Sequence, residues 1–215
     1  MIVCLIYKSV GYLNFIYEQI KDYSYMFVAN DATPEVLEAL KGKNHIIYND
    51  PKPEAYYLER VYRAWNFGGF NVDSDIIIFV NSDMWFGPNW IDNLLKHFDR
   101  NTIPVSRCIE AGKYKAINHA ITKYFGNSWT NLNTNGILNY MNKISEDKIL
   151  PNGYFMPCVF YKDDFIKSGG YPEGNVGKIS GDKYFFYNNL IMKEKKHITV
   201  CNSLVYHIWE GEMDG

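Results

Sequence analysis

A chain of 215 residues is long enough to bury a sizeable core and fits one domain of ordinary to large size. Hydrophobic residues make up 47% of it and charged residues 21%, which is typical of a globular protein and excludes a disordered one. The 22 basic and 24 acidic side chains give a formal net charge of −2, so the composition gives no sign of a nucleic-acid-binding surface.

The hydrophobic runs are short, and none approaches the roughly 20 residues that a membrane-spanning helix needs. The apolar start at residues 1–7 is too brief for the core of a signal peptide and lacks a cleavage site. The four cysteines lie in or beside strand-like segments without a Cys-x-x-Cys pair, which argues against a zinc cage. These features predict free, buried thiols in a reducing compartment, and therefore a cytoplasmic protein without a membrane span.

The first half of the chain alternates strand and helix signals. Apolar runs predict strands over residues 2–7, 25–29, 46–48, 76–80 and 103–108. Apolar residues at intervals of three and four predict helices over residues 13–20, from Pro34 after a Thr33 cap, from Leu58 to near Gly68-Gly69, and over 88–98. This order predicts an α/β fold with a Rossmann-like, mostly parallel central sheet flanked by helices.

The second half is less regular. The spacing predicts a helix over residues 116–124, while residues 126–152 are rich in Asn, Gly and Ser and predict loops with a short helix at 137–141. A strand at 155–161, a short helix capped by Asp163, a helix after Asp182 and strands at 198–201 and 204–207 complete the chain. We find no internal repeat and no linker, so residues 1–215 are predicted to form a single domain.

Carboxylates follow two of the predicted parallel strands. In such sheets ligands bind beyond the carboxyl ends of the strands, which is where Asp31 and Asp83 lie. A carboxylate held there is a suitable ligand for Mg²⁺ or Mn²⁺. For Asp83 the alternative is an ordinary loop start ahead of Gly87.

Other polar side chains are candidates, each with an ordinary structural alternative. His207 is a possible metal ligand if the fold brings it beside Asp83, and otherwise a satisfied core histidine. Asp182 is a possible catalytic carboxylate or a helix cap. Arg60 and Arg63, spaced i and i+3, would meet a diphosphate or a base, or simply form a solvated helix face. Tyr7 could stack on a base or belong to the core.

Several stretches share their order with the motifs of a known family. They are VANDAT at residues 28–33, WNFGGF at 65–70, IIIFVNSD at 76–83, YFMPCVFYKDDFIKSGGYPEG at 154–174, and VYHIWEGE at 205–212. Across nearly the whole chain they resemble the GT-A class of nucleotide-sugar glycosyltransferases, most nearly the broad family of bacterial and viral polysaccharide transferases. The resemblance implies a GT-A fold in which residues 1–108 bind the nucleotide sugar and residues 109–215 bind the acceptor and carry catalysis.

The same resemblance implies metal-dependent transfer of a hexose or deoxyhexose from a UDP-sugar to a hydroxyl of a glycan or glycoprotein. It places Mn²⁺ or Mg²⁺ on Asp83 and His207, and the acidic catalytic group on Asp182. As aromatic residues, Trp85 and Trp209 are candidate stacking platforms for the acceptor sugar, or else simply core residues. The residues assigned to the donor are Tyr7, Asp31, Arg60, Arg63, Asn81 and Ser82.

Two positions depart from the family's pattern. Asn81 stands where the first carboxylate of the metal motif is expected, and Gly181 stands where a glutamate usually precedes Asp182. These departures support a rival hypothesis, a non-catalytic sugar-binding or nucleotide-binding module on the same fold. A sugar nucleotidyltransferase is a further alternative, although residues 8–11 make a poor phosphate loop with one glycine. The compact size and the Asn- and Tyr-rich composition resemble domains of large DNA viruses, including algal-virus capsid glycosyltransferases, which would place the protein in the host cytoplasm.

Overall fold

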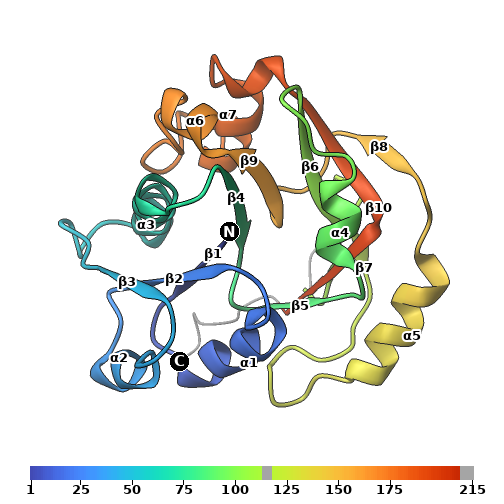
Figure 1. The fold of residues 1–215 in the computed structure, drawn as a ribbon, viewed down its shortest axis with the longest axis horizontal. Coiled ribbons are helices and arrows are strands. Elements are labelled where there is room, and N and C mark those ends of the chain that lie inside the picture. The colour runs from blue at the N-terminus through green and yellow to red at the C-terminus, as the bar shows by residue number, and fades with distance from the viewer. Residues whose placement is uncertain (113–117, 209–215) are drawn as a thin grey trace.

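The computed structural model describes residues 1–112 and 118–208, which form one ten-stranded sheet flanked by helices (Figure 1). The main strand order is β3-β2-β1-β4-β9-β6-β10-β5, with β7 beside β6 and β8 beside β10. The strands are β1 Ile2–Ile6, β2 Tyr25–Asn30, β3 His45–Tyr48, β4 Ile76–Val80, β5 Met84–Phe86, β6 Thr102–Glu110, β7 Ile121–Thr122, β8 Ile149–Pro151, β9 Cys158–Tyr161 and β10 Lys196–His207. The predicted α/β fold with a mostly parallel sheet is confirmed.

Helices cover both faces of the sheet. They are α1 Val10–Ile20, α2 Pro34–Ala39, α3 Tyr57–Asn71, α4 Trp90–Leu95, α5 Thr134–Ile144, α6 Lys162–Lys167, α7 Gly181–Tyr187 and the 3-10 helix η1 Met192–Glu194. The Thr33 side chain accepts a hydrogen bond from the Val36 amide, and Pro34 fills the first turn of α2, as the sequence predicts.

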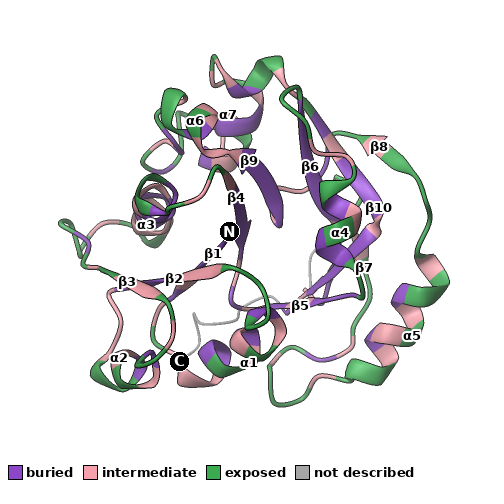
Figure 2. Cartoon of the chain, in the orientation of Figure 1, coloured by how far each residue is buried: buried purple, intermediate pink, exposed green. Residues whose placement is uncertain are grey.

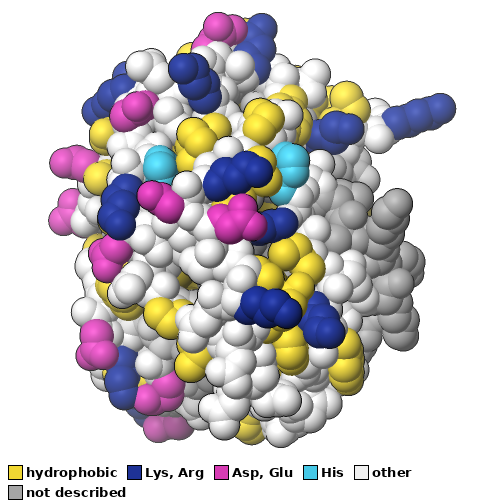
Figure 3. Space-filling model, turned by 90° about the vertical axis from the view of Figure 1, so that its right-hand side faces the viewer, with side chains coloured by type: hydrophobic (Ala, Val, Ile, Leu, Met, Phe, Trp, Pro, Cys, Tyr) yellow, Lys and Arg dark blue, Asp and Glu magenta, His cyan; other side chains and the backbone are white. Residues whose placement is uncertain are grey.

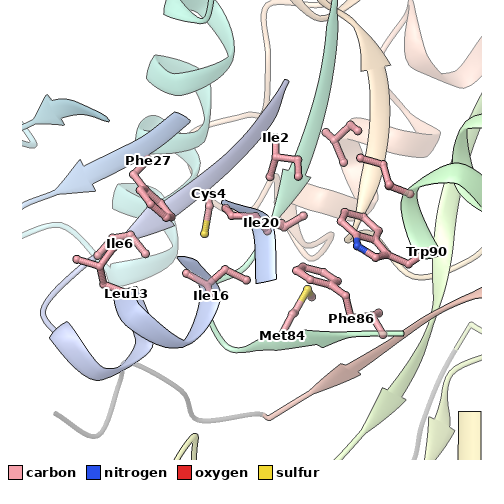
Figure 4. Packing of buried hydrophobic residues seen from close by; sticks show 14 of the residues in the cluster. Ile2, Cys4, Ile6, Leu13, Ile16, Ile20, Phe27, Met84, Phe86 and Trp90 are labelled. Carbon is pink, nitrogen blue, oxygen red and sulfur yellow. The ribbon is translucent and has the colours of Figure 1, made fainter. Parts of the chain in front are cut away.

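Alternation along β1 separates two hydrophobic cores. Ile2, Cys4 and Ile6 pack in one cluster with residues of α1, α2 and α4, whereas Val3 packs in another with residues of α3, α6 and α7. Figure 4 shows the first cluster, in which the β1 side chains face Leu13 and Ile16 of α1. Buried residues are concentrated on the central strands (Figure 2), so the sheet forms a rigid base for groups at its edges.

The glycines of α3 bring that helix close to the sheet. The helix continues past Gly68-Gly69 and ends at Asn71, close to its predicted end near the glycines. A Cβ atom on Gly68 would lie 2.7 Å from Val28 Cγ2, and one on Gly69 would lie 2.5 Å from Phe165 Cε1. Glycine is needed there for close packing and not for a turn.

The second half corrects further expectations. The predicted strands at 198–201 and 204–207 are one strand, β10, with a register shift between Val200 and Leu204. In the described part of the predicted 116–124 helix, the chain instead forms the short strand β7. The first turn of α6 contains Asp163, and its N-cap is Tyr161. Strand β9 begins only at Cys158, after Pro157, which lacks an amide hydrogen for pairing.

The remaining global features concern cysteines, helices and charge. All four cysteines are buried and form no disulfide bond, as the sequence predicts. Within residues 1–112 and 118–208, none of the helices combines the length and the apolar character needed to cross a bilayer. On the face shown in Figure 3, the described basic and acidic side chains are interspersed, so this face presents mixed charge.

Candidate active site

Polar groups from five strands meet at one edge of the sheet. Strands β1, β2 and β4 are parallel, and β9 runs antiparallel to both β4 and β6. Strand β6, and β10 parallel to it, therefore run in the same direction as β4, so all five carboxyl ends share an edge. The side chains carried at or just beyond these ends are Tyr7, Asp31, Asp83, Glu110 and His207.

At this edge His207 lies between two carboxylates. Its Nε2 atom is 3.3 Å from Asp83 Oδ2, and its Nδ1 atom is 3.0 Å from Glu110 Oε2. Strand pairing creates this row, because His207 is in register with Met84 on β5 and with Glu110 on β6. The fold thus brings together Asp83 and His207, which are far apart in the sequence.

The electrostatics of this group favour positive charge at its centre. Burial lowers the pKa of His207, but the charge of Asp83 and the hydrogen bonds to Asp83 and Glu110 prevail and hold that pKa well above its usual range. Burial raises the pKa of Glu110, yet the contact with His207 prevails and lowers it. Burial also raises the pKa of Tyr154, whose hydroxyl hydrogen-bonds Glu110 and stays protonated beside it.

These residues fit a divalent cation. Glu110 holds the Nδ1 side of His207, the usual arrangement behind a metal-binding histidine, and leaves Nε2 directed at Asp83. Cys108 Sγ also lies within 4.8 Å of ligand atoms of Glu110 and His207. Burial raises the pKa of that thiol well above its usual range, and the thiol donates to Glu110 Oε1 at 3.3 Å. The available ligands are therefore one imidazole nitrogen and carboxylate oxygens, which suit Mn²⁺ or Mg²⁺.

Neighbouring candidates occupy the turn between β4 and β5. Ser82 is buried and Asn81 is half-buried, both one or two residues before Asp83. Trp85 pairs with Tyr206 across β5 and β10 and packs, half-buried, against the cluster around it. Trp209, the other expected stacking residue, lies outside the described residues.

Beside β1 and β2, Asp31 and Arg60 form a second polar group. Arg60 Nη2 donates to Asp31 Oδ2 at 2.5 Å, and the Arg60 guanidinium lies 5.6 Å from the centre of the Tyr7 ring. Asp31 has a left-handed φ of 47°, which turns the chain sharply at the end of β2. Arg60 Nε is buried without a hydrogen-bond partner among the described residues. An arginine, a carboxylate and an aromatic ring therefore converge here.

Arg63 has a different environment from the solvated helix face considered above. Its side chain is only 8% exposed and donates twice to Asp50, at 2.9 Å in each bond. The Asp50 amide in turn donates to Asp31 Oδ1 at 2.8 Å. Arg63 thus supports Asp31 through Asp50, a buried pair that sequence spacing does not reveal.

Asp182 lies in the first turn of α7. Its amide donates to the Tyr62 hydroxyl at 3.1 Å, and its Oδ1 accepts from the Lys183 amide at 2.7 Å. The charge of Asp182 contributes to the raised pKa of Tyr154, so this carboxylate and Glu110 both act on the same hydroxyl. Asp182 comes from α7 and His207 from the end of β10, so the assignment of both to one site stays a prediction.

The structure explains the glycine before Asp182. A Cβ atom on Gly181 would lie 2.5 Å from the Gly174 carbonyl oxygen and 2.6 Å from the Tyr62 ring. We expect Gly181→Glu to lower the free energy of unfolding by about 1–3 kcal/mol, because backbone must move to admit the side chain. Urea denaturation measures the effect, with Lys183→Glu as a control that adds the same group at an exposed position. Unchanged stability of Gly181→Glu would show that room exists.

Sequence reasoning missed three residues of the site. Glu110 was beyond the predicted end of its strand, although it follows the same rule as Asp83, a polar group where an apolar strand stops. Tyr154 and Asp50 lie in loops, where the sequence carries no periodic signal. Their proximity depends on tertiary structure alone.

Comparisons with known proteins bear on the family and the fold of the chain. A family model described as Glycosyl transferase family 2 matches residues 21–166. No curated protein sequence matches the chain. Among solved structures, the crystal structure of S. aureus TarS 1-349 is similar, with a TM-score of 0.54 and 11% sequence identity. The alignment covers 96% of this chain and 60% of TarS 1-349, so this chain spans less than two thirds of that one, and the likeness concerns the fold.

Proposed function

Because the chain belongs to glycosyl transferase family 2, we propose that it transfers a sugar from a UDP-sugar to a hydroxyl of a glycan or glycoprotein. The transferred group would be a hexose or deoxyhexose, and Mn²⁺ or Mg²⁺ would be the cofactor. The observation that carries this proposal is the row Glu110–His207–Asp83 at the carboxyl edge of the sheet. It combines a cation-favouring centre with the position at which such sheets bind ligands.

The metal would be held by His207 Nε2 and Asp83, with donor phosphates as further ligands. A bound divalent ion supplies Lewis-acid stabilisation of the charge on the departing diphosphate. Glu110 fixes the orientation of the His207 ring through its Nδ1 contact. Asn81 and Ser82, which precede Asp83, would contact the ribose or the phosphates.

The donor's base would bind at Tyr7, Asp31 and Arg60. Asp31 can accept the N3–H of uracil, and the buried Arg60 Nε can donate to a neighbouring carbonyl of the base. Tyr7 offers a ring for stacking. Arg63 would take part by holding Asp50 against Asp31.

Asp182 would act on the acceptor or on the donor sugar, depending on the stereochemistry. If the enzyme inverts the anomeric centre, Asp182 would remove the proton of the acceptor hydroxyl as general base. If it retains the configuration, Asp182 would position the donor sugar. Trp85 and Trp209 remain proposed contacts for the acceptor.

The test is release of nucleoside diphosphate from a panel of nucleotide sugars, with and without Mn²⁺ or Mg²⁺. We expect metal-dependent release from one UDP-sugar, which would also identify the donor. Binding of a nucleotide sugar without release of nucleoside diphosphate would favour a non-catalytic module, the rival hypothesis that rests on the departures at Gly181 and Asn81. Formation of a nucleotide sugar with release of pyrophosphate would favour a nucleotidyltransferase.

We expect Glu110→Gln to weaken Mn²⁺ binding by about 10- to 100-fold, because the histidine loses its orienting carboxylate. Glutamine keeps the shape of the side chain, so the fold should be preserved. Titration with Mn²⁺, followed by electron paramagnetic resonance, measures the affinity. Equal affinities of variant and wild type would remove Glu110 from the metal site.

We also propose a cellular location and a source for this protein. The four buried cysteines form no disulfide bond, which favours a reducing compartment such as the cytoplasm. The Asn- and Tyr-rich composition favours a viral source, with the host cytoplasm as the site of action. Fractionation of cells that express the full-length protein would test the location directly.

A further inference from the structure

A loop over residues 123–133 begins directly at the metal-binding row. It follows β7, whose Thr122 is in register with Glu110 of β6, and the Lys123 amide donates to the Glu110 carbonyl at 3.1 Å. In Figure 1 the segment runs from β7 past α1 to α5. The loop therefore borders the site on the side of β6 and β10.

Hydrogen bonds hold this loop in one conformation. The Tyr206 hydroxyl of β10 accepts from the Phe125 amide at 2.9 Å and donates to the Gly126 carbonyl. Within the loop, Asn131 Oδ1 accepts from the amides of residues 127 and 128, at 3.0 and 2.9 Å. The Asn133 amide closes the loop by donating to the Phe125 carbonyl at 2.8 Å. A loop tied in this way loses little conformational entropy when a ligand binds.

The loop presents two exposed aromatic side chains. Trp129 is 45% exposed and Tyr124 is 63% exposed. The Trp129 indole rests on Gly11, where a Cβ atom would lie 2.5 Å from indole Nε1 and Cε2. Gly11 lies in the first turn of α1, so the indole reaches from the β6 side of the edge to the start of that helix.

We propose that Trp129, supported by Gly11 and accompanied by Tyr124, is a stacking platform for a pyranose ring of the acceptor glycan. The assignment of the bound sugar as the acceptor rests on the proposed function. The binding of a pyranose ring by Trp129 does not depend on it. The indole face offers apolar contact to the axial C–H bonds of a hexopyranose. Because the indole is already held in position, little conformational entropy is lost when the sugar binds. The ring would then lie between the start of this loop, beside Glu110, and the start of α1.

The test measures binding of methyl hexopyranosides by ligand-detected nuclear magnetic resonance. The panel contains methyl β-glucopyranoside, methyl β-galactopyranoside and methyl α-mannopyranoside. We expect at least one to bind the wild type, with the dissociation constant raised about tenfold in Trp129→Ala, the loss typical of one aromatic contact. Gly11→Ala should weaken binding similarly, since its methyl group displaces the indole while the tryptophan and the helix remain.

A matched control is Tyr23→Ala. The exposed fraction of Tyr23, 40%, is similar to the 45% of Trp129. Tyr23 precedes β2, however, and so lies at the opposite, amino edge of the sheet. Its loss should leave pyranoside binding unchanged. Equal binding by wild type, Trp129→Ala and Gly11→Ala, or binding of no pyranoside, would overturn the platform.

A second measurement separates this inference from the proposed function. Metal-dependent release of nucleoside diphosphate, with water as acceptor, should be unchanged in Trp129→Ala because this reaction uses no glycan acceptor. A wild type that releases no nucleoside diphosphate but binds pyranosides through Trp129 would refute glycosyl transfer and uphold the platform. A wild type that releases nucleoside diphosphate but binds no pyranoside would uphold the proposed function and refute the platform.

Discussion

Asp83→Ala is expected to lower metal-dependent release of nucleoside diphosphate by about a thousandfold or more, the scale of losing a principal electrostatic group at a transition state. Asp83 Oδ2 lies 3.3 Å from His207 Nε2. Without it, His207 would be the remaining protein ligand among those proposed, and Mn²⁺ affinity should fall together with turnover. Kinetics and a Mn²⁺ titration on the same preparation measure both quantities.

The control for Asp83→Ala is Asp22→Ala, which removes an exposed aspartate from the turn after α1. Circular dichroism and thermal melting establish that both variants remain folded. Full activity of Asp83→Ala with normal Mn²⁺ dependence would refute the assignment of Asp83 as a metal ligand. Lost activity with unchanged Mn²⁺ affinity would place Asp83 on the donor instead.

The charge of the site helps to explain how an asparagine can occupy position 81. Asn81 lacks the negative charge expected there, but the His207 ring still contacts two carboxylates, Asp83 on one side and Glu110 on the other. Glu110 is buried and keeps a lowered pKa through His207. We infer that Glu110 supplies part of the negative potential that a carboxylate at position 81 would otherwise provide.

The sequence indicates the site where a local rule applies. Apolar strands that stop at polar residues identify Asp31, Asp83 and His207, because such strands are buried until they reach the sheet's edge. The same rule misses Glu110, since β6 extends two residues beyond its predicted end and remains buried there. Strand periodicity therefore locates the end of a strand to within one or two residues. That precision does not decide which of two neighbouring side chains lies at the sheet's edge.

Features that depend on strand order were not predictable. Antiparallel β9 lies between β4 and β6, and β5 joins β10, so Asp83 and Glu110 reach opposite sides of one histidine. No local pattern encodes that neighbourhood. Likewise, Gly181 looks like a lost catalytic residue in the sequence, whereas its contacts with Gly174 and Tyr62 show a packing requirement.

Asp182→Asn is the variant that separates chemistry from binding. We expect sugar transfer to fall by about 10²- to 10⁴-fold, the usual contribution of a positioned general base. The affinity for the UDP-sugar should stay nearly the same, because the proposed base-binding and metal-binding groups belong to other parts of the fold than α7. Calorimetric titration of the donor and the rate of nucleoside diphosphate release measure the two effects separately.

Asparagine is a stringent replacement at position 182 because it preserves the local structure. Its side-chain oxygen can still accept a hydrogen bond from the Lys183 main-chain amide, and its main-chain amide can still donate to the Tyr62 hydroxyl. A loss of rate with intact donor affinity therefore reports on the missing charge and not on the start of α7. A loss of donor affinity would instead make Asp182 a donor-binding residue, as retention of configuration requires, and a normal rate would remove it from the chemistry.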